Sequence, residues 1–375
     1  MLEFADPSTL TFAQILGNTI NEWIQLAIAA FAGGAFGAAL GALPVFIFTG
    51  FLVIAGEAAN LGLAESGAIG DPAALGAAGL TGNVAFGPVF GPHTAFAGGA
   101  AAVAYAAKKG YVETGFDYHE AKNIPYALGT KPDVLAVGGL FGILGMLITN
   151  VSVQLGAPWD PIAMGVTLSA LFHRLILGYS IIGTVRSSGM FDMSPFERGE
   201  TRGAAADGGE AATDGGTVES NRLVVEPWLP HQYKWGGVAT LGITVGLLAA
   251  WIGLITGSYF LAFGISAATL VFLNCGVEQT PVTHHISLPA ATAAIVATQS
   301  GSAPLAGMGL TGALIVGGAF GLLGALLGEV HQRIFYAHSD THWDPPAASI
   351  VATTFVIAVL AMVGVFPEAG WVPLP

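Results

Sequence analysis

Long continuous apolar runs recur along the chain and set the first prediction. Each run covers about 20 residues, the length that a helix needs to cross a hydrocarbon core about 30 Å thick. The runs show no alternation of period two, which favours helices over the strands of a β-barrel. Ten spans are predicted, near residues 22–40, 41–59, 84–107, 134–155, 161–184, 235–255, 257–275, 281–299, 307–330 and 346–366. The sequence therefore predicts an all-α integral membrane protein with about ten transmembrane helices.

The composition excludes other classes of protein. Charged residues make up 9% of the chain and hydrophobic residues 53%, whereas soluble proteins carry about 25% charged residues. The net charge of −13 argues against a nucleic-acid partner. A single cysteine, Cys275, permits neither an internal disulfide nor a cysteine-based metal cluster. The excess of acidic over basic residues, 24 against 11, is typical of proteins that work in a high-salt cytoplasm. We therefore expect a halophilic archaeal source.

The basic residues predict an orientation, because Lys and Arg gather in cytoplasmic loops. They concentrate at residues 108–131, at 186–234 and at Arg333. With ten spans, these three loops fall on one side of the membrane. We therefore expect a multi-pass protein of the cell membrane with both termini outside.

An internal repeat divides the chain. VGGLFGILG at residues 137–145 matches VGGAFGLLG at residues 316–324 at seven of nine positions, and a Trp-Asp-Pro triplet follows each, at 159–161 and 343–345. This order predicts two five-helix units, residues 1–186 and 235–375, joined by an acidic Gly/Ala-rich cytoplasmic linker at 187–234. Because five is odd, the second unit enters the membrane from the opposite side, so the repeat is expected to be inverted.

Gly- and Pro-rich stretches interrupt comparable apolar runs in both units. The first contains Pro92 and His93, and the second contains Thr283, His284 and His285. Proline removes a backbone donor, so these helices are expected to be broken or to start late, with free backbone groups at membrane depth. Paired broken helices point to a transport site. These residues are the predicted substrate or ion pathway, although a histidine can equally serve as a cap or packing element.

Two carboxylates are added to the predicted pathway. Glu57 lies near the end of the second span and Glu278 lies between the seventh and eighth. An ionisable group inside a span is costly and is a functional candidate by default. We expect Glu57 and Glu278 to act in coupling or selectivity, the alternative being carboxylates that reach water at the interface.

Other polar residues in the spans favour structural roles. Asp160 and Asp344 precede prolines, which predicts N-caps of transmembrane helices accompanied by interfacial tryptophans. His173 and Arg174 interrupt the apolar run LSALFHRLILG. Arg174 is expected to reach the cytoplasmic interface or to pair with a carboxylate such as Glu57.

A last cluster contains His338 and His342, four residues apart. On a helix they would share a face and could bind a divalent metal with a nearby carboxylate. A cytoplasmic loop is the favoured interpretation, since no HExxH pattern is present. No GxxxxGK[ST] motif occurs either, which disfavours an ATP-driven pump. We expect no resident cofactor, with a divalent metal as the exception.

The LPAAT segment at residues 288–292, within a five-plus-five order of spans, resembles the LPxxT element of urea transporters. The resemblance covers five residues and has no counterpart in the first unit, so no site residue is assigned from it.

Together these patterns predict a non-enzymatic transport protein that moves a small solute or ion between the two units. A secondary transporter is favoured, and a passive channel is the first alternative. A membrane-embedded metal-binding protein or enzyme using His338 and His342 is a second alternative, and a non-transporting scaffold is a third. The expected partners are the lipid bilayer and the solute, and small-residue surfaces would permit a homo-oligomer.

Overall fold

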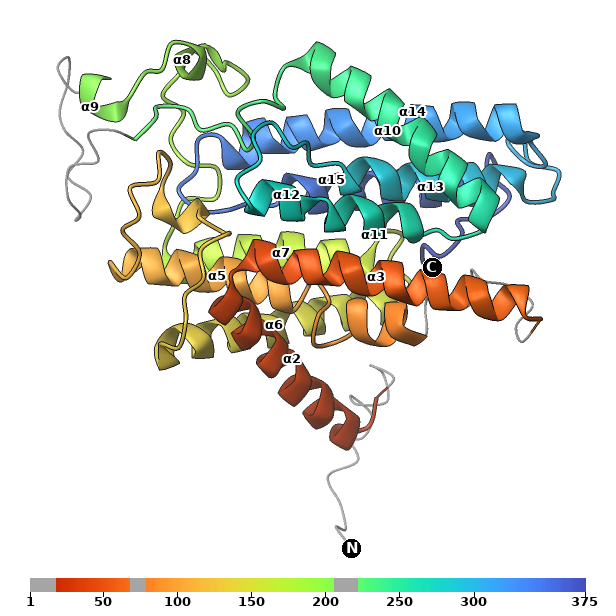
Figure 1. The fold of residues 1–375 in the computed structure, drawn as a ribbon, viewed down its shortest axis with the longest axis horizontal. Helices are drawn as coiled ribbons and strands as arrows, with labels where there is room; N and C mark the ends of the chain where they lie inside the picture. The colour runs from red at the N-terminus through yellow and green to blue at the C-terminus, as the bar shows by residue number, and fades with distance from the viewer. Residues whose placement is uncertain (1–17, 68–78, 206–221) are drawn as a thin grey trace, which may run out of the picture.

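The computed structural model describes residues 18–67, 79–205 and 222–375. These residues form helices that run largely along the long axis of the molecule (Figure 1), and they contain no strand beyond an isolated bridge between Thr201 and Leu223. The α-helices are α2 (Ile20–Leu40), α3 (Ala42–Glu65), α5 (Ala95–Lys108), α6 (Pro132–Gln154), α7 (Pro161–Leu177), α8 (Ser194–Glu197), α9 (Arg202–Ala205), α10 (Trp235–Thr256), α11 (Leu261–Ala268), α12 (Leu270–Asn274), α13 (His284–Thr298), α14 (Leu310–His331) and α15 (Pro345–Met362). Short η helices lie at Thr81–Ala85, Glu120–Lys122 and Gln332–Tyr336. The predicted all-α class is confirmed for the described residues.

Six helices are long and apolar enough to cross a membrane, as expected of a multi-pass membrane protein. They are Ile20–Leu40, Ala42–Glu65, Pro132–Gln154, Trp235–Thr256, Leu310–Tyr336 and Pro345–Met362. The segments Pro161–Leu177 and Leu261–Asn274 are apolar but shorter, and α5 and α13 have 14 and 15 residues. The prediction of ten full transmembrane helices is therefore not confirmed.

The short helices have local causes in the sequence. The predicted span at 84–107 is helical in α5 only from Ala95, because Pro88 and Pro92 interrupt the preceding stretch. Similarly, α13 begins at His284, after Pro281. The predicted span at 161–184 ends early, since Gly178 adopts a left-handed conformation with φ of 73°.

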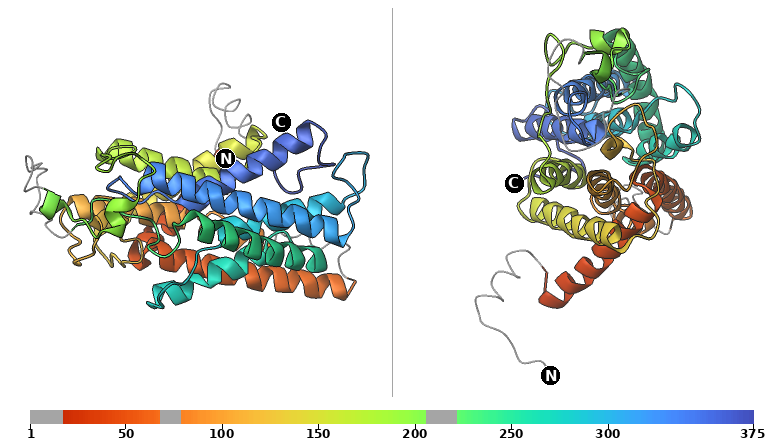
Figure 2. Two further views of the ribbon diagram at one scale, coloured as in Figure 1. Left: turned by 90° about the horizontal axis from the view of Figure 1, so that it is seen from above. Right: turned by 90° about the vertical axis from the view of Figure 1, so that its left-hand side faces the viewer.

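The two sets of five helices pack in the same pattern. In the first, α5 contacts α2, α3, α6 and α7, while α2 packs on α6; in the second, α13 contacts α10, α11, α14 and α15, while α10 packs on α14. The central helices α5 and α13 are buried over nearly their whole length. Between the sets, α3 packs on α11 and α7 on α15. The end-on view in Figure 2 shows the two groups as neighbouring bundles.

The repeated glycines explain why the VGG motif recurs. A Cβ atom on Gly138 would meet the backbone of Gly34 on α2, and one on Gly317 would meet Ala250 on α10. A Cβ atom on Gly324 would lie 2.5 Å from the carbonyl oxygen of His285, and one on the matching Gly145 would overlap the carbonyl oxygen of His93. The motif therefore lets neighbouring helices approach closely at matching places in both units.

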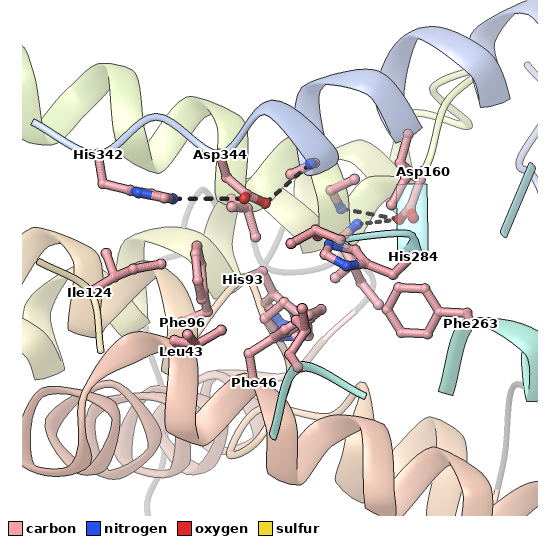
Figure 3. Close-up of a pocket in the computed structure, with 18 of the residues that line it drawn as sticks. Leu43, Phe46, His93, Phe96, Ile124, Asp160, Phe263, His284, His342 and Asp344 are labelled. Atoms are coloured by element: carbon pink, nitrogen blue, oxygen red, sulfur yellow. Dashed lines mark hydrogen bonds and ion pairs between the residues drawn. The ribbon is translucent and has the colours of Figure 1, made fainter. Parts of the chain in front are cut away.

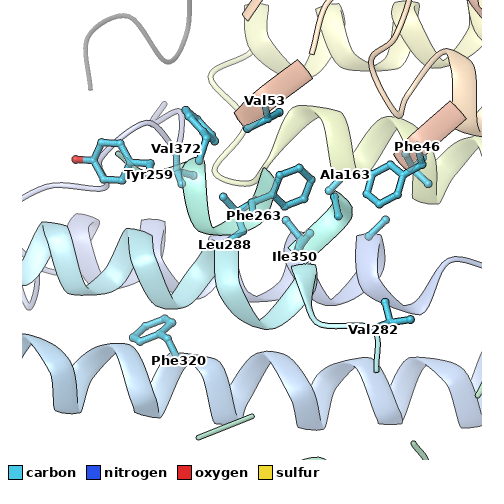
Figure 4. Close-up of a cluster of buried hydrophobic side chains, with 14 of the residues drawn as sticks. Phe46, Val53, Ala163, Tyr259, Phe263, Val282, Leu288, Phe320, Ile350 and Val372 are labelled. Atoms are coloured by element: carbon cyan, nitrogen blue, oxygen red, sulfur yellow. The ribbon is translucent and has the colours of Figure 1, made fainter. Parts of the chain in front are cut away.

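The largest apolar cluster lies between the two units rather than inside one of them. Figure 4 shows Phe46 and Val53 from α3 facing Phe263, Leu288 and Ile350 from the second unit. All five side chains are buried, with at most 6% of their surface exposed. The units are thus joined by a shared core.

The predicted linker at 187–234 is only partly described, since residues 206–221 lie outside the described ranges. The described flanks of this segment are packed into the protein. Met193, Val224, Val225 and Tyr233 are buried in one cluster with Ala337. The apolar residues on either side of the acidic stretch supply this cluster, which fixes the flanks to the second unit.

Candidate functional site

A cavity of about 840 Å³ lies between the two units, within the range of 300 to about 1,000 Å³ typical of small-molecule sites. Both units supply its walls, which include the labelled side chains of Figure 3. At one end the lining includes the exposed residues Phe116 and Asp117, and at the far end of α6 it includes the exposed Val153. The cavity walls therefore extend between the two ends of the bundle.

Two histidines face this cavity from the starts of the two central helices. His93 precedes α5 and is 4% exposed, while His284 is the first residue of α13 and is 5% exposed. The Nδ1 atom of each has no hydrogen-bond partner among the described residues. The His284 ring lies 4.9 Å from the Phe46 ring. Both imidazole rings therefore form part of the cavity wall, each with a buried Nδ1 atom.

The other predicted pathway residues near these helix starts take different places. Pro92 lines the cavity, whereas Thr283 and His285 do not. His285 packs closely on Gly328, and its ring lies 6.1 Å from the Trp228 ring. Of these two adjacent histidines, His284 lines the cavity and His285 packs outside it.

Two helix-capping carboxylates also line the cavity, one from each unit. Asp160 Oδ1 accepts hydrogen bonds from the backbone N–H groups of Ile162 and Ala163, at 2.8 and 3.2 Å. Asp344 Oδ2 accepts one from Ala347 at 3.1 Å. The predicted N-cap roles at the starts of α7 and α15 are confirmed, and the same two carboxylates face the cavity.

These two carboxylates have little compensating positive charge. No Lys or Arg side chain within the described ranges forms an ion pair with Asp160 or Asp344. Asp344 has a titratable neighbour in His342, whose Nε2 lies 3.7 Å from Asp344 Oδ1 (Figure 3). Burial lowers the pKa of His342, which favours its neutral form.

Aromatic rings form much of the remaining wall. Phe46 lies between Phe96 and Phe263, with ring centroids 5.8 and 6.1 Å apart, and Phe260 contacts Trp371 at 5.2 Å. All five line the cavity. Such walls suit an apolar body or the face-on approach of a cation.

Lys122 is the one Lys or Arg among the described lining residues, and it is already paired. Its Nζ lies 2.5 Å from Glu226 Oε2, with both side chains fully buried, and it donates to the Tyr336 carbonyl at 2.8 Å. Arg222 bonds both Glu226, at 2.5 Å, and Asp340, at 2.8 Å. We call Lys122, Arg222, Glu226 and Asp340 the loop lock. These ion pairs connect all three basic loops, which were predicted to lie on one side of the membrane.

The loop lock has shifted pKa values. Burial lowers the pKa of Lys122 to about 8, an effect that the charge of Glu226 partly offsets. Burial raises the pKa of Glu226, but the nearby charges of Lys122 and Arg222 outweigh burial and hold it below its usual value. The sequence did not indicate this group, because its residues come from three separate loops that only the folded chain brings together.

The predicted coupling carboxylates lie away from the cavity lining. Glu57 is 1% exposed and accepts hydrogen bonds from Thr81 Oγ1 at 2.7 Å and Ser258 Oγ at 2.5 Å. Ser258 belongs to the connection between α10 and α11, so Glu57 joins the two units. Glu278 is exposed. Neither is among the lining residues, and the structure does not bring them together.

His173 and Arg174 bind the second unit through hydroxyl and carbonyl groups. Arg174 is fully buried, and its donors reach Thr341 Oγ1, Ser339 Oγ and the Thr341 carbonyl, each at 2.9 Å. His173 Nε2 lies 3.0 Å from Thr341 Oγ1. The expected pairing with Glu57 is therefore wrong, because the segment before α15 supplies the partners instead.

The tryptophans of the two repeated triplets were expected at the membrane interface. Trp343 is instead 5% exposed, and its ring stacks on Phe335 with centroids 4.5 Å apart. The Arg174 guanidinium lies 5.4 Å from the Trp343 ring. The interfacial placement is therefore wrong for Trp343, which packs inside the protein.

His338 and His342 do not form the helical pair that a metal site would require, because residues 337–344 are not helical. His338 Nε2 lies 3.0 Å from the carbonyl oxygen of Met190. Over the described ranges, no group of three or more His, Cys, Asp or Glu side chains is arranged to hold a metal ion.

Comparison with known proteins shows one family match for this chain. The profile of one protein family, described as "Family of unknown function (DUF7973)", matches residues 17–375. No curated protein and no solved structure matches the chain. The short LPAAT segment therefore remains the extent of the resemblance to urea transporters.

Proposed function

The chain belongs to this family of unknown function (DUF7973), and we propose that it is a membrane transporter that moves a small organic solute through the cavity between its two units. The observation that carries the proposal is the cavity itself. Both units wall it, and its lining includes exposed residues toward each end of the bundle. A cavity of about 840 Å³ with mostly apolar walls suits an organic molecule better than a bare inorganic ion, which prefers many oxygen ligands.

The way the units meet supports an inverted repeat. Along the contact between α3 and α11, Gly50 lies against Ala268 and Gly264 lies against Val53. Residue numbers rise on one helix as they fall on the other, so these two helices of equivalent position run antiparallel. A two-fold axis between them would turn one unit upside down relative to the other. Inverted repeats of this kind recur in secondary transporters, where they supply two oppositely open states.

The orientation follows from the basic loops. The loop lock gathers them at one end of the bundle, and Lys and Arg mark the cytoplasmic side. We place this end in the cytoplasm of a cell-membrane protein and both termini outside. The C-terminal helix α15 begins at the loop end and runs away from it (Figure 1), in agreement with this orientation.

Uptake by proteoliposomes tests the transport proposal. Ala347 lines the cavity and is 5% exposed, so Ala347→Phe should fill the passage, while Ala347→Ser preserves the space. We expect accumulation of a solute from a panel of small organic ions, loss of this uptake in Ala347→Phe and its retention in Ala347→Ser. Acceleration of uptake by the same solute preloaded inside would indicate a transporter, and flux without acceleration would indicate a channel. Equal flux in Ala347→Phe would contradict a route through this cavity.

A further inference from the structure

The cavity carries an excess of negative charge. Asp160, 6% exposed, and Asp344 face it from opposite units without an Arg or Lys partner among the described residues. Asp117 adds a third carboxylate at an exposed edge of the lining. Lys122 supplies the opposing charge, but Glu226 neutralises it at 2.5 Å. An occupant with a positive charge would meet two uncompensated carboxylates.

A buried carboxylate without a counter-charge is costly. The N-termini of α7 and α15 offset part of the cost through backbone N–H groups. The remaining lone pairs of both carboxylates are free to accept from a ligand. A cation in the cavity would thus be stabilised by charges that the fold already holds in place.

A feature independent of the carboxylates, the aromatic wall, favours the same ligand. The rings of Phe46, Phe96 and Phe263 pack on one another along the cavity wall, with Phe46 at 5.8 Å from Phe96 and 6.1 Å from Phe263. Aromatic faces attract ammonium groups, especially at desolvated sites.

We propose that the cavity binds an organic ammonium ion with an apolar body, its charge held by Asp160 and Asp344 and its body enclosed by the phenylalanine walls. The inference rests on the cavity of the proposed transporter and names its substrate class. Because each unit contributes one carboxylate, the cation keeps a counter-charge whichever side of the cavity opens. An organic anion would face both carboxylates and gain no unpaired basic side chain from the described lining.

Calorimetric titration of the purified full-length protein in detergent tests this proposal with three probes of similar size. Benzyltrimethylammonium is the cation, benzyl alcohol the neutral probe and benzoate the anion. We expect the cation to bind at least about tenfold more tightly than either of the others, which corresponds to about 1.4 kcal/mol. Equal binding of all three, or tighter binding of benzoate, would overturn the proposal.

Charge-removing variants locate the binding site. Asp160→Asn and Asp344→Asn keep the N-cap, because asparagine caps helices as well as aspartate does. Each should weaken binding of the cation by about tenfold. Asp133→Asn is the matched control, since Asp133 is an exposed carboxylate bonded to Tyr105 and Tyr111 outside the cavity. Unchanged cation binding in both cavity variants would show that these carboxylates are not the counter-charge.

The same probes separate this inference from the transport proposal. Binding of benzyltrimethylammonium without its uptake into proteoliposomes would support the cation site and contradict transport. Uptake of a neutral or anionic solute that Ala347→Phe blocks, without cation binding, would support transport and overturn the cation site.

Discussion

At the level of single residues, buried charged side chains occur in two different surroundings. Lys122 and Glu226 are fully buried but neutralise each other at the loop end, whereas Asp160 and Asp344 face the cavity without a Lys or Arg partner among the described residues. Removing one partner of a buried ion pair destabilises the fold, whereas an unpaired buried carboxylate is a candidate ligand-binding group. The two pairs of residues therefore predict different consequences of mutation.

Glu226→Gln is expected to destabilise the protein strongly. The change leaves Lys122 buried beside Arg222 without its counter-charge, and breaking a buried pair in this way costs about 3 to 5 kcal/mol. Thermal unfolding in detergent measures the effect. Glu200→Gln, in the exposed pair with Arg198, is the control and should change little. Equal unfolding temperatures for the two variants would show that the loop lock does not stabilise the fold.

The same pair predicts how stability depends on pH. The folded-state pKa of Glu226 is lower than its usual 4.5 because the charges of Lys122 and Arg222 outweigh burial. A lowered carboxylate pKa stabilises the folded state above pH 4.5, and this contribution is lost as the pH falls through the folded-state value. Unfolding temperatures measured from pH 6 to pH 3 should fall more steeply in the wild type than in Glu226→Gln. Parallel curves would contradict this assignment.

At the scale of helices, glycine positions decide how closely the elements pack. Gly145 on α6 lies where a Cβ atom would overlap the carbonyl oxygen of His93, and Gly324 on α14 holds the matching position against His285. These contacts fix the starts of α5 and α13, which present His93 and His284 to the cavity. The recurrent VGG motif is thus a packing feature that also positions the candidate site.

Gly145→Ala should destabilise the protein by about 1 to 3 kcal/mol or more, the usual cost of overpacking a tight contact. Gly62→Ala is the matched control. Gly62 also lies in a helix, α3, but nothing lies within 4 Å of an added Cβ atom, so the change should be neutral or slightly stabilising. Unfolding of both variants is measured in parallel. A Gly145→Ala variant as stable as the wild type would show that α5 can shift freely from α6.

Helix locations followed from the sequence, while helix lengths and side-chain partners did not. Apolar runs and the caps at Asp160 and Asp344 placed the helices and their starts, because both depend on neighbouring residues. The prolines before α5 and α13 predicted late helix starts, but the nearly complete burial of these two helices depends on tertiary packing. Hydropathy cannot distinguish a short buried helix from a full span.

At the scale of the whole molecule, the candidate site is a product of the way the two units meet. His93 and His284 were predicted from interrupted helices, and both reach the cavity. Glu57 and Glu278 were predicted from their positions near span ends, yet neither lines it. Asp160 and Asp344 were interpreted as caps alone. The set of side chains that lines the cavity depends on packing between residues far apart in the sequence, and a local sequence pattern does not predict such packing.

We propose that the cavity between the two units opens in turn to each side of the membrane. The most direct measurement is the labelling of Ala347→Cys, in a Cys275→Ser background, with a membrane-impermeant maleimide added to sealed proteoliposomes of uniform orientation from either face. Cys275 is exposed and must be removed to leave one reporter, while Ala347 lines the cavity. We expect labelling from both faces, slowed on each by bound benzyltrimethylammonium. Labelling from one face alone, or from neither, would contradict this proposal.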